Sequence, residues 1–255
     1  DLILANNSNI QITGILVDDG AAVAATKTIT VTGTATAAGT LNVYVAGRKV
    51  AVAVANGDDA NTIAAAIEAA VDADTDLIMS ASSATNVATL TAKNGGEWTD
   101  KLVVSVNPFT SARGGSEVNP AGVTIVVADG VAGSGNPSIS AAIAAIPDER
   151  YDYILQPYND DSNMDLMDTE LDNRQNAMVQ LEGHAFNAFS GTLSEATTYG
   201  GLRNSKHTTT MYAGEGSISP EHHWAGAYIG VASSIASNDP ALPWQGRSLA
   251  GITPE

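Results

Sequence analysis

Ser190-Gly191 is the place in the sequence that most resembles a catalytic nucleophile. The serine is expected where a strand ends and a helix begins, which is where α/β hydrolases carry their nucleophile. Asp129 and His184 could complete a triad with it. However, the G-x-S-x-G pattern is absent, and any chain of this length offers such triples. A turn followed by a helix cap is favoured, and an α/β serine hydrolase using Ser190 stays open as an alternative.

A glycine-rich stretch at residues 130–137, Gly-Val-Ala-Gly-Ser-Gly-Asn-Pro, could place backbone N–H groups around a phosphate. Its spacing is not G-x-G-x-x-G, and no Lys-Ser/Thr pair follows. The stretch therefore indicates a flexible turn between a strand and a helix.

The four histidines offer little for metal binding. His222 and His223 are adjacent, so on a helix their side chains point about 100° apart and do not easily share one ion. The H-E-x-x-H pattern is also absent. We predict no metal site and no cofactor.

Acidic side chains crowd the segment 148–172, where Arg150 is the only base. A solvated helix face is the simplest interpretation. A calcium loop at residues 160–163 is disfavoured because the full ligand pattern is missing. The sharper hypothesis is a subunit interface that meets a basic patch on another copy. Its candidate residues are Asp160, Asp161, Asp165 and Asp168.

Composition excludes several classes of protein. The chain has 255 residues, no cysteine and a net charge of -17. Disulfide scaffolds, zinc-thiolate sites, iron–sulfur clusters and cysteine catalysis all require the missing thiols. The negative charge disfavours binding to nucleic acid and to anionic membranes. Charged residues are only 15% of the chain, so Thr, Ser, Asn, Gly and Ala must form much of the surface, as in many virion and secreted proteins.

Up to about residue 120 the chain shows mostly the alternation of half-buried strands. Strands are predicted at 28–34, 41–45, 50–54, 77–81, 87–92 and 102–106, with a hairpin around Gly47. Ile63, Ile67 and Val71 recur every four residues, which predicts a helix over 59–73. We therefore expect a small α+β module, mainly antiparallel β with one helix, at 26–107, followed by a linker at 108–122.

From residue 123 onward, short apolar runs alternate with helical patterns. Val123–Val127 is predicted to be a strand buried on both faces, and further strands are expected at 151–158, 183–190 and 207–213. Helices are expected from Pro137, from Asn163, from Ser194 and from Ser219, the second with Met164, Met167, Leu171 and optionally Met178. This alternation predicts an α/β three-layer domain with a mostly parallel sheet over 123–255.

An ordered series of short motifs in this second region resembles contractile phage tail sheath proteins of the Mu-like branch. The strand Tyr151–Asp160, sequence YDYILQPYND, matches their "fDyIv.PYtD" pattern. It is followed in order by 181–186, 190–193, 203–207, Ser219-Pro220, Trp224-Ala225, 239–241 and Pro243. The resemblance covers about 123–255. It implies that 26–107 is the module inserted into Mu-like sheaths and that 1–25 is a lead-in segment of the sheath core.

The resemblance implies a structural and non-enzymatic role. Sheath subunits stack as rings around a tail tube and contract, which drives the tube through a bacterial envelope. The implied partners are other copies of the chain, the tail tube protein and the baseplate, without nucleic acid or membrane. The implied location is the virion tail, assembled in the host cytoplasm.

In that family, terminal arms exchange strands between subunits. The chain begins at Asp1 without a leader and ends at Glu255, so we expect a fragment that lacks these arms and associates weakly, if at all. A secreted surface or adhesion protein, suggested by the Thr/Ala-rich module, stays open as a further alternative.

Overall fold

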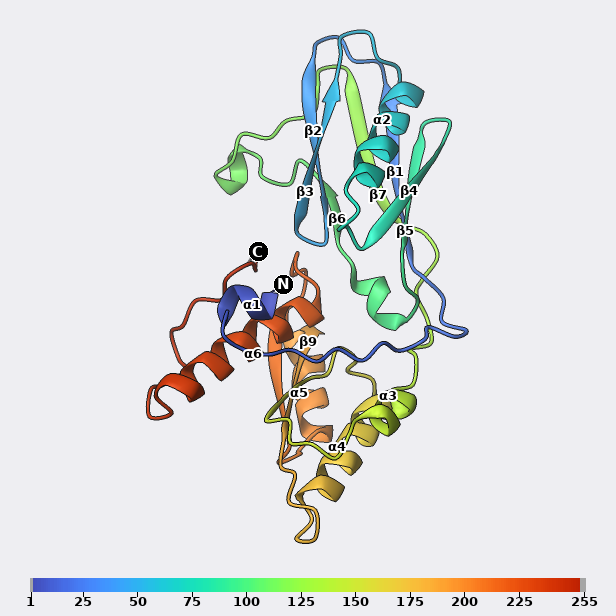
Figure 1. Cartoon of the computed structure of the whole chain (residues 1–255). Coiled ribbons are helices and arrows are strands. Elements are labelled where there is room, and N and C mark those ends of the chain that lie inside the picture. Colours follow the sequence, from blue (N-terminus) through green and yellow to red (C-terminus); the bar gives the residue numbers. More distant parts are fainter. Residues whose placement is uncertain (1, 253–255) are drawn as a thin grey trace. The chain divides into compact units, whose positions relative to one another are not determined.

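A computed structural model describes residues 2–252. The chain divides into two compact units, which are described separately (Figure 1). The central unit comprises residues 19–137, and the terminal unit combines the residues before 19 with those after 137. The predicted domain boundaries at 26–107, 108–122 and 123–255 stay predictions.

Two sheets and one long helix form the central unit. One sheet has the order β4(Met79–Ala84), β5(Val87–Ala92), β1(Thr26–Gly33) and β7(Val123–Asp129). The other has the order β3(Arg48–Val54), β2(Gly39–Val45) and β6(Val104–Val106). All neighbouring strands in both sheets are antiparallel. Short 3₁₀ helices lie at η1(Glu97–Lys101) and η2(Ser111–Arg113).

The β2–β3 hairpin is confirmed, with a turn of two residues. Val45 pairs with Arg48, which leaves Ala46 and Gly47 as the loop. Both loop residues have positive φ, at 50° and 85°. Positive φ at both positions defines a type I′ turn, whose twist matches that of the paired strands. Gly47 adopts this conformation easily because it lacks a Cβ atom.

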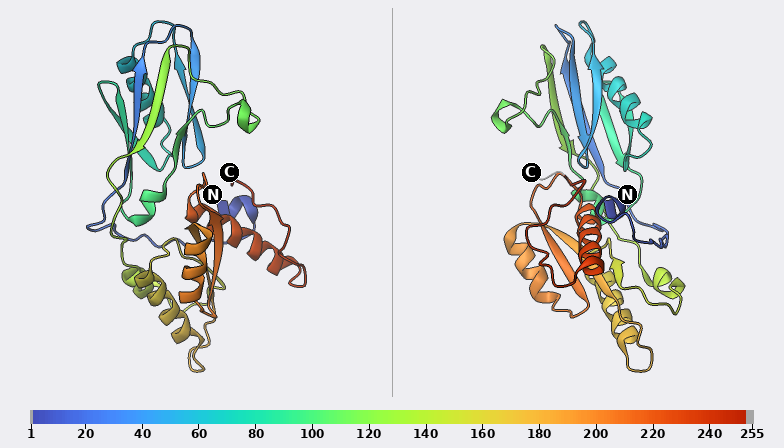
Figure 2. Two further views of the ribbon diagram at one scale, coloured as in Figure 1. Left: turned by 180° about the vertical axis from the view of Figure 1, so that it is seen from behind. Right: turned by 60° about the vertical axis from the view of Figure 1, so that its left-hand side comes forward.

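The predicted helix of the central unit is confirmed as α2(Ala60–Ala73). The Asp59 side chain accepts a hydrogen bond from the Thr62 backbone N–H and caps the first turn. Ile63, Ile67 and Val71 are buried, and the helix lies along the strands (Figure 2, right). These side chains join apolar residues from both sheets in one cluster, so α2 completes the core of the central unit.

The prediction for residues 123–127 was wrong. β7 is the edge strand of an antiparallel sheet in the central unit, where Lys27 pairs with Asp129 and Gly33 with Val123. Val123 is buried and Ile125 and Val127 are half-buried, whereas the residues between them are exposed, so the strand is not buried on both faces. Val126, for example, is exposed. A run of β-branched residues fits either kind of strand, and the pairing with β1, almost a hundred residues earlier, decided between them.

Gly33→Ala tests a very close backbone approach in the central unit. Gly33 has φ +96°, and a Cβ atom there would collide with the Gly122 carbonyl oxygen. We expect the substitution to lower the free energy of unfolding by about 3 kcal/mol, since it adds a clash to an unfavourable φ. Gly57 also has φ +96° but has open space around it. Gly57→Ala should therefore lower the free energy of unfolding by only about 1 kcal/mol, with both variants measured by guanidinium titration. Equal losses would show that the approach to Gly122 is unimportant.

The terminal unit is built on a parallel sheet. Its strands are β8(Tyr153–Leu155), β9(His184–Gly191) and β10(Thr208–Gly214), in the order β10-β9-β8. Both neighbouring pairs are parallel. The helices are α1(Leu2–Asn6), α3(Ser140–Ala145), α4(Asp161–Gln175), α5(Leu193–Leu202) and α6(Glu221–Asn238). The predicted alternation of strands and helices is therefore confirmed from residue 140 onward, except that Met178 lies beyond α4 and is 91% exposed.

Two apolar clusters flank the β9 strand. Ala185 packs with Met167 and Leu171 of α4, whereas its neighbour Phe186 packs with Ile229 of α6. Adjacent residues of a strand point to opposite faces, so α4 and α6 cover opposite faces of the sheet. The mixture of helices with parallel and antiparallel sheets confirms the broad fold class; the three-layer arrangement of the predicted domain stays a prediction.

The helix α1 packs against α6 although more than two hundred residues separate them (Figure 1). A Cβ atom on Gly230 would lie 2.7 Å from the Asn6 Cβ. The Asn6 side chain also accepts a hydrogen bond from the Ala250 backbone N–H at 2.8 Å. The glycine thus permits a close helix contact that brings residues from both ends of the described chain together.

Candidate assembly surface

The possible catalytic triad is not assembled. His184 begins β9, and Ser190 lies six positions further along the same strand. At about 3.3 Å per residue these side chains are roughly 20 Å apart. The His184 Nε2 is instead 2.7 Å from the Thr209 Oγ1. Asp129 belongs to the central unit and forms an ion pair with Lys27. The geometry therefore gives no support to a hydrolase that uses these three residues.

Ser190 takes part in a hydrogen-bond network around the buried Glu221 carboxylate. Its backbone N–H donates to Glu221 Oε1 at 2.6 Å, and the Asn159 amide donates to Glu221 Oε2 at 2.8 Å. Asn159 also donates to the Ala188 carbonyl oxygen. Glu221 is only 6% exposed and stands in the first turn of α6. Glu221 was not predicted as a functional residue, although a glutamate directly after Ser-Pro at the expected helix start was an available signal.

The glycine-rich stretch packs against its own unit. A Cβ atom on Gly133 would collide with the Thr99 Oγ1, and Gly135 has φ +69°. Backbone hydrogen bonds join Val23 and Ser134 in both directions. These contacts support the interpretation of residues 130–137 as a turn that requires glycine.

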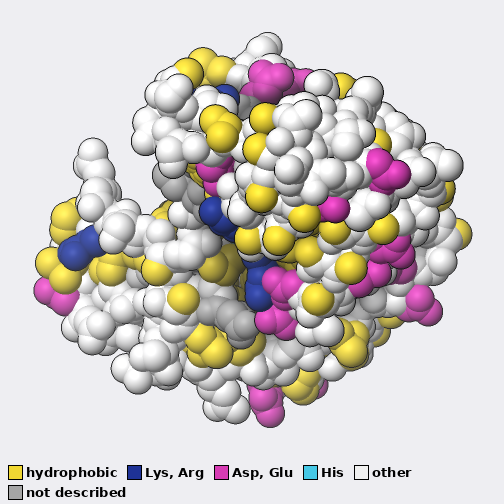
Figure 3. Space-filling view, turned by 90° about the horizontal axis from the view of Figure 1, so that it is seen from above, with side chains coloured by type: hydrophobic (Ala, Val, Ile, Leu, Met, Phe, Trp, Pro, Cys, Tyr) yellow, Lys and Arg dark blue, Asp and Glu magenta, His cyan; other side chains and the backbone are white. Residues whose placement is uncertain are grey.

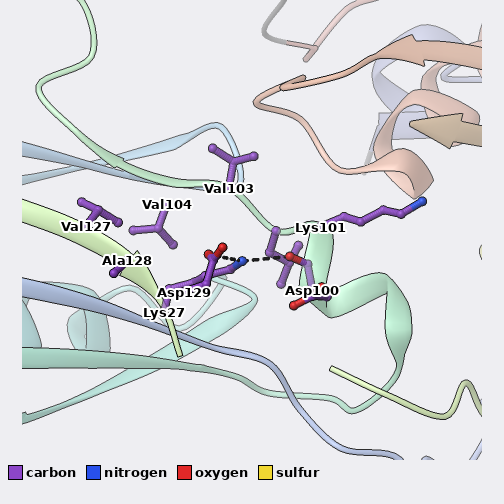
Figure 4. Close-up of a pocket in the computed structure, with 9 residues that line it drawn as sticks. Lys27, Asp100, Lys101, Val103, Val104, Val127, Ala128 and Asp129 are labelled. Atoms are coloured by element: carbon purple, nitrogen blue, oxygen red, sulfur yellow. Dashed lines mark hydrogen bonds and ion pairs between the residues drawn. The ribbon is translucent and has the colours of Figure 1, made fainter. Parts of the chain in front are cut away.

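Lys27 lies at one side of a cavity of about 370 Å³ in the central unit (Figure 4). Its Nζ donates to the Asp129 Oδ1 at 2.7 Å and to the Asp100 carbonyl oxygen at 2.8 Å. The Lys101 side chain extends away from this group (Figure 4). The buried lysine is thus neutralised by an exposed carboxylate and joins β1, β7 and η1.

The adjacent histidines of α6 are partly enclosed by the protein. Burial, aided by the neighbouring His223, lowers the pKa of His222 to about 3. Their rings are 4.6 Å apart in an edge-to-face arrangement. Within residues 2–252 no group of three or more His, Asp or Glu side chains is placed to hold a metal ion.

The four candidate interface carboxylates lie at the beginning and along one side of α4. Asp160 caps the helix, because its side chain accepts a hydrogen bond from the Asn163 backbone N–H. Asp161 and Asp165 both form ion pairs with Arg203. Asp168 Oδ1 accepts hydrogen bonds from the Ser205 and Thr208 hydroxyls at 2.8 and 2.9 Å.

Asp172, a turn further along α4, extends the same arrangement. Its Oδ1 lies 3.1 Å from Lys206 Nζ and 3.0 Å from His207 Nε2. These contacts lower the pKa of Asp172, chiefly through its hydrogen bond with His207. The spacing of three and four residues places the carboxylates on one helix face. We call this set the carboxylate row: Asp161, Asp165, Asp168 and Asp172.

The partner of the carboxylate row is the segment 203–208, which connects α5 to β10 in the same unit. The Arg203 side chain is 8% exposed, whereas those of Asp161 and Asp165 are 73% exposed. Asp161 and Asp165 therefore bind Arg203 within the chain while most of their side-chain surface stays in contact with solvent. The predicted contact of Asp160, Asp161, Asp165 and Asp168 with another subunit stays a prediction.

The surface is sparsely charged in the view of Figure 3. Uncharged atoms dominate this face, and acidic side chains outnumber basic ones. This agrees with a chain that contains 28 acids and 11 bases.

The edge strand β10 carries no charged residue and no proline, its sequence being TTTMYAG. It pairs with β9 on one side and ends the sheet on the other. The Ala185 N–H donates to the His207 carbonyl oxygen. In a parallel pair the bonding residues alternate, so positions 208, 210 and 212 direct their backbone groups toward the open edge. A long uncharged edge of this type is suited to pairing with a further strand.

The comparisons with known proteins show that the chain is similar to phage tail sheath proteins. Residues 132–254 match the family model for the phage tail sheath protein central domain. The Mu-like prophage FluMu tail sheath protein of Haemophilus influenzae is 31% identical over 242 residues. That match covers 94% of this chain and 48% of the relative, so the chain spans about half the length of that protein. The resemblance predicted from the sequence motifs is confirmed.

Proposed function

We propose that the chain is the body of a structural subunit that polymerises into a contractile sheath around a tail tube. The match to a tail sheath protein over 94% of the chain carries this proposal. Contraction then drives the tube through a bacterial envelope. Its partners are further copies of itself, the tube protein and the baseplate, and it resides in the virion tail after assembly in the host cytoplasm. Assembly and contraction of such a sheath require no catalytic step by the chain.

The β10 edge gives this proposal a physical means of assembly. An extended segment of a neighbouring subunit that adds to β10 would satisfy its open backbone groups at 208, 210 and 212. The added strand makes main-chain hydrogen bonds and requires no charge on the edge. This mode of pairing suits an acidic protein, because identical copies with high net charge repel one another.

Electron microscopy of the full-length protein tests the proposed function. Expressed alone or with its tube protein, it should form regular tubes or shorter contracted cylinders. Dispersed particles under every salt and protein concentration would contradict a sheath role and would favour an adhesion protein. Stoichiometric labelling of Ser190 by a serine-directed probe would instead favour the hydrolase.

Within residues 2–252, no helix combines the length and the hydrophobicity that crossing a membrane requires.

A further inference from the structure

The connection between α5 and β10 is held mainly by polar contacts to one helix face. Arg203 contacts Asp161 and Asp165, and the Ser205 and Thr208 hydroxyls contact Asp168. Lys206 and His207 then contact Asp172. The segment 203–208 has the sequence Arg-Asn-Ser-Lys-His-Thr and contains no apolar residue, so apolar burial contributes little to holding it in place.

We propose that the carboxylate row is an intrachain latch that fixes the edge strand β10 in position for strand addition. The segment 203–208 leads directly into β10, and Thr208 is both the last residue held by the row and the first residue of the strand. Loss of the row would therefore free the beginning of β10. The latch proposal rests on the proposed function, because the latch holds the β10 edge that a neighbouring subunit would use.

Arg203 is the central residue of the latch. Its guanidinium is mostly buried, and within the described residues its Nε has no hydrogen-bond partner. Removing both aspartates would leave a buried cation without its counter-charges, which is strongly unfavourable. The arginine would then have to move toward water and take the connection with it.

The latch responds to salt and to acid. Its acids are Asp161, Asp165, Asp168 and Asp172 from α4; the bases facing them are Arg203, Lys206 and His207 from the connection, with His184 of β9 near His207. The pKa of Asp172 is lowered in the folded chain. Its contribution is therefore complete above the usual aspartate pKa and is lost as the pH falls through the lowered value. Salt weakens the exposed pairs at any pH.

Hydrogen exchange on the 255-residue chain tests the latch without requiring assembly. In an Asp161→Asn, Asp165→Asn double variant, amides of 203–210 should exchange about tenfold faster, and so should the Ala185 amide, which bonds to the His207 carbonyl oxygen. The His184 amide, which bonds to the Asp152 carbonyl oxygen on the β8 side, should stay unchanged. Raising the salt concentration should accelerate the same amides in the wild type but have little further effect in the variant. Glu215→Gln, which changes an exposed acid outside the row, is the control and should alter neither region.

Unchanged exchange at 203–210 in the double variant would overturn the latch, whatever the full-length protein does. If exchange accelerates, the same substitutions in the full-length protein should reduce tube formation several-fold at equal concentration. Accelerated exchange with undiminished tubes would overturn the link between the latch and strand addition. Failure of the wild type to form tubes would instead count against the proposed function, and the exchange result would still decide whether the latch exists.

Discussion

Replacing Tyr212 by proline should abolish tube formation by the full-length protein while leaving the subunit folded. Tyr212 lies on β10, where the alternation of hydrogen bonds directs its N–H away from β9 and toward the open edge. Proline removes that donor. Edge strands tolerate proline where the missing N–H would face solvent, so the bonds between β10 and β9 should persist. A partner strand, by contrast, would lose a ladder hydrogen bond and meet the proline ring.

The matched control is Tyr212→Ala, which removes the same side chain but keeps the backbone donor. Both variants lose the hydrogen bond from the Tyr212 hydroxyl to the Gly191 carbonyl oxygen. The free energies of unfolding of the two variants should therefore agree within about 1 kcal/mol. Only the proline variant should lose tubes in negative-stain micrographs. If the proline variant assembles as well as the alanine variant, strand addition does not take place at this part of the β10 edge.

Local patterns in the sequence predicted most of the elements because those elements are stabilised locally. The helix α2 begins after a capping aspartate and repeats Ile63, Ile67 and Val71 on one face. The β2–β3 hairpin closes through a two-residue turn that contains Gly47. In both cases the residues that decide the structure are neighbours in the chain, so a short window of sequence contains the necessary information.

The position of β7 could not be predicted in this way. Its neighbour in the sheet is β1, and Lys27 pairs with Asp129 across about a hundred residues. The sequence 123–127 is compatible with a buried parallel strand or with a half-buried edge strand. Only the alternating exposure along β7, which results from that distant pairing, distinguishes the two.

The structure places Asp161, Asp165 and Asp168 on one face of α4, but their contacts within the chain were not foreseen. The segment that meets this face, 203–208, contains Arg203, Lys206 and His207, all visible in the sequence. Local sequence patterns do not show that the segment 203–208, some forty residues after the start of α4, returns to pack on that helix.

Glu221→Ala should lower the free energy of unfolding of the terminal unit by about 3 kcal/mol. The Glu221 carboxylate is buried, accepts the Ser190 N–H at 2.6 Å and accepts the Asn159 amide at 2.8 Å. Alanine leaves the Ser190 donor without this acceptor in a partly buried position, which costs more than the hydrogen bond itself contributes. The substitution also removes a negative charge from the first turn of α6, where the helix dipole favours it.

Glu195 provides the comparison that separates burial from helix capping. It too stands in the first turn of a helix and accepts a backbone N–H, from Thr192 at 2.8 Å, but it is exposed. Water can replace that acceptor, so Glu195→Ala should cost only about 0.5–1 kcal/mol. In a Trp98→Phe background the remaining tryptophans, Trp224 and Trp244, both report on the terminal unit during guanidinium unfolding. Equal losses for the two glutamates would show that the buried network around Ser190 contributes no more than an ordinary helix cap.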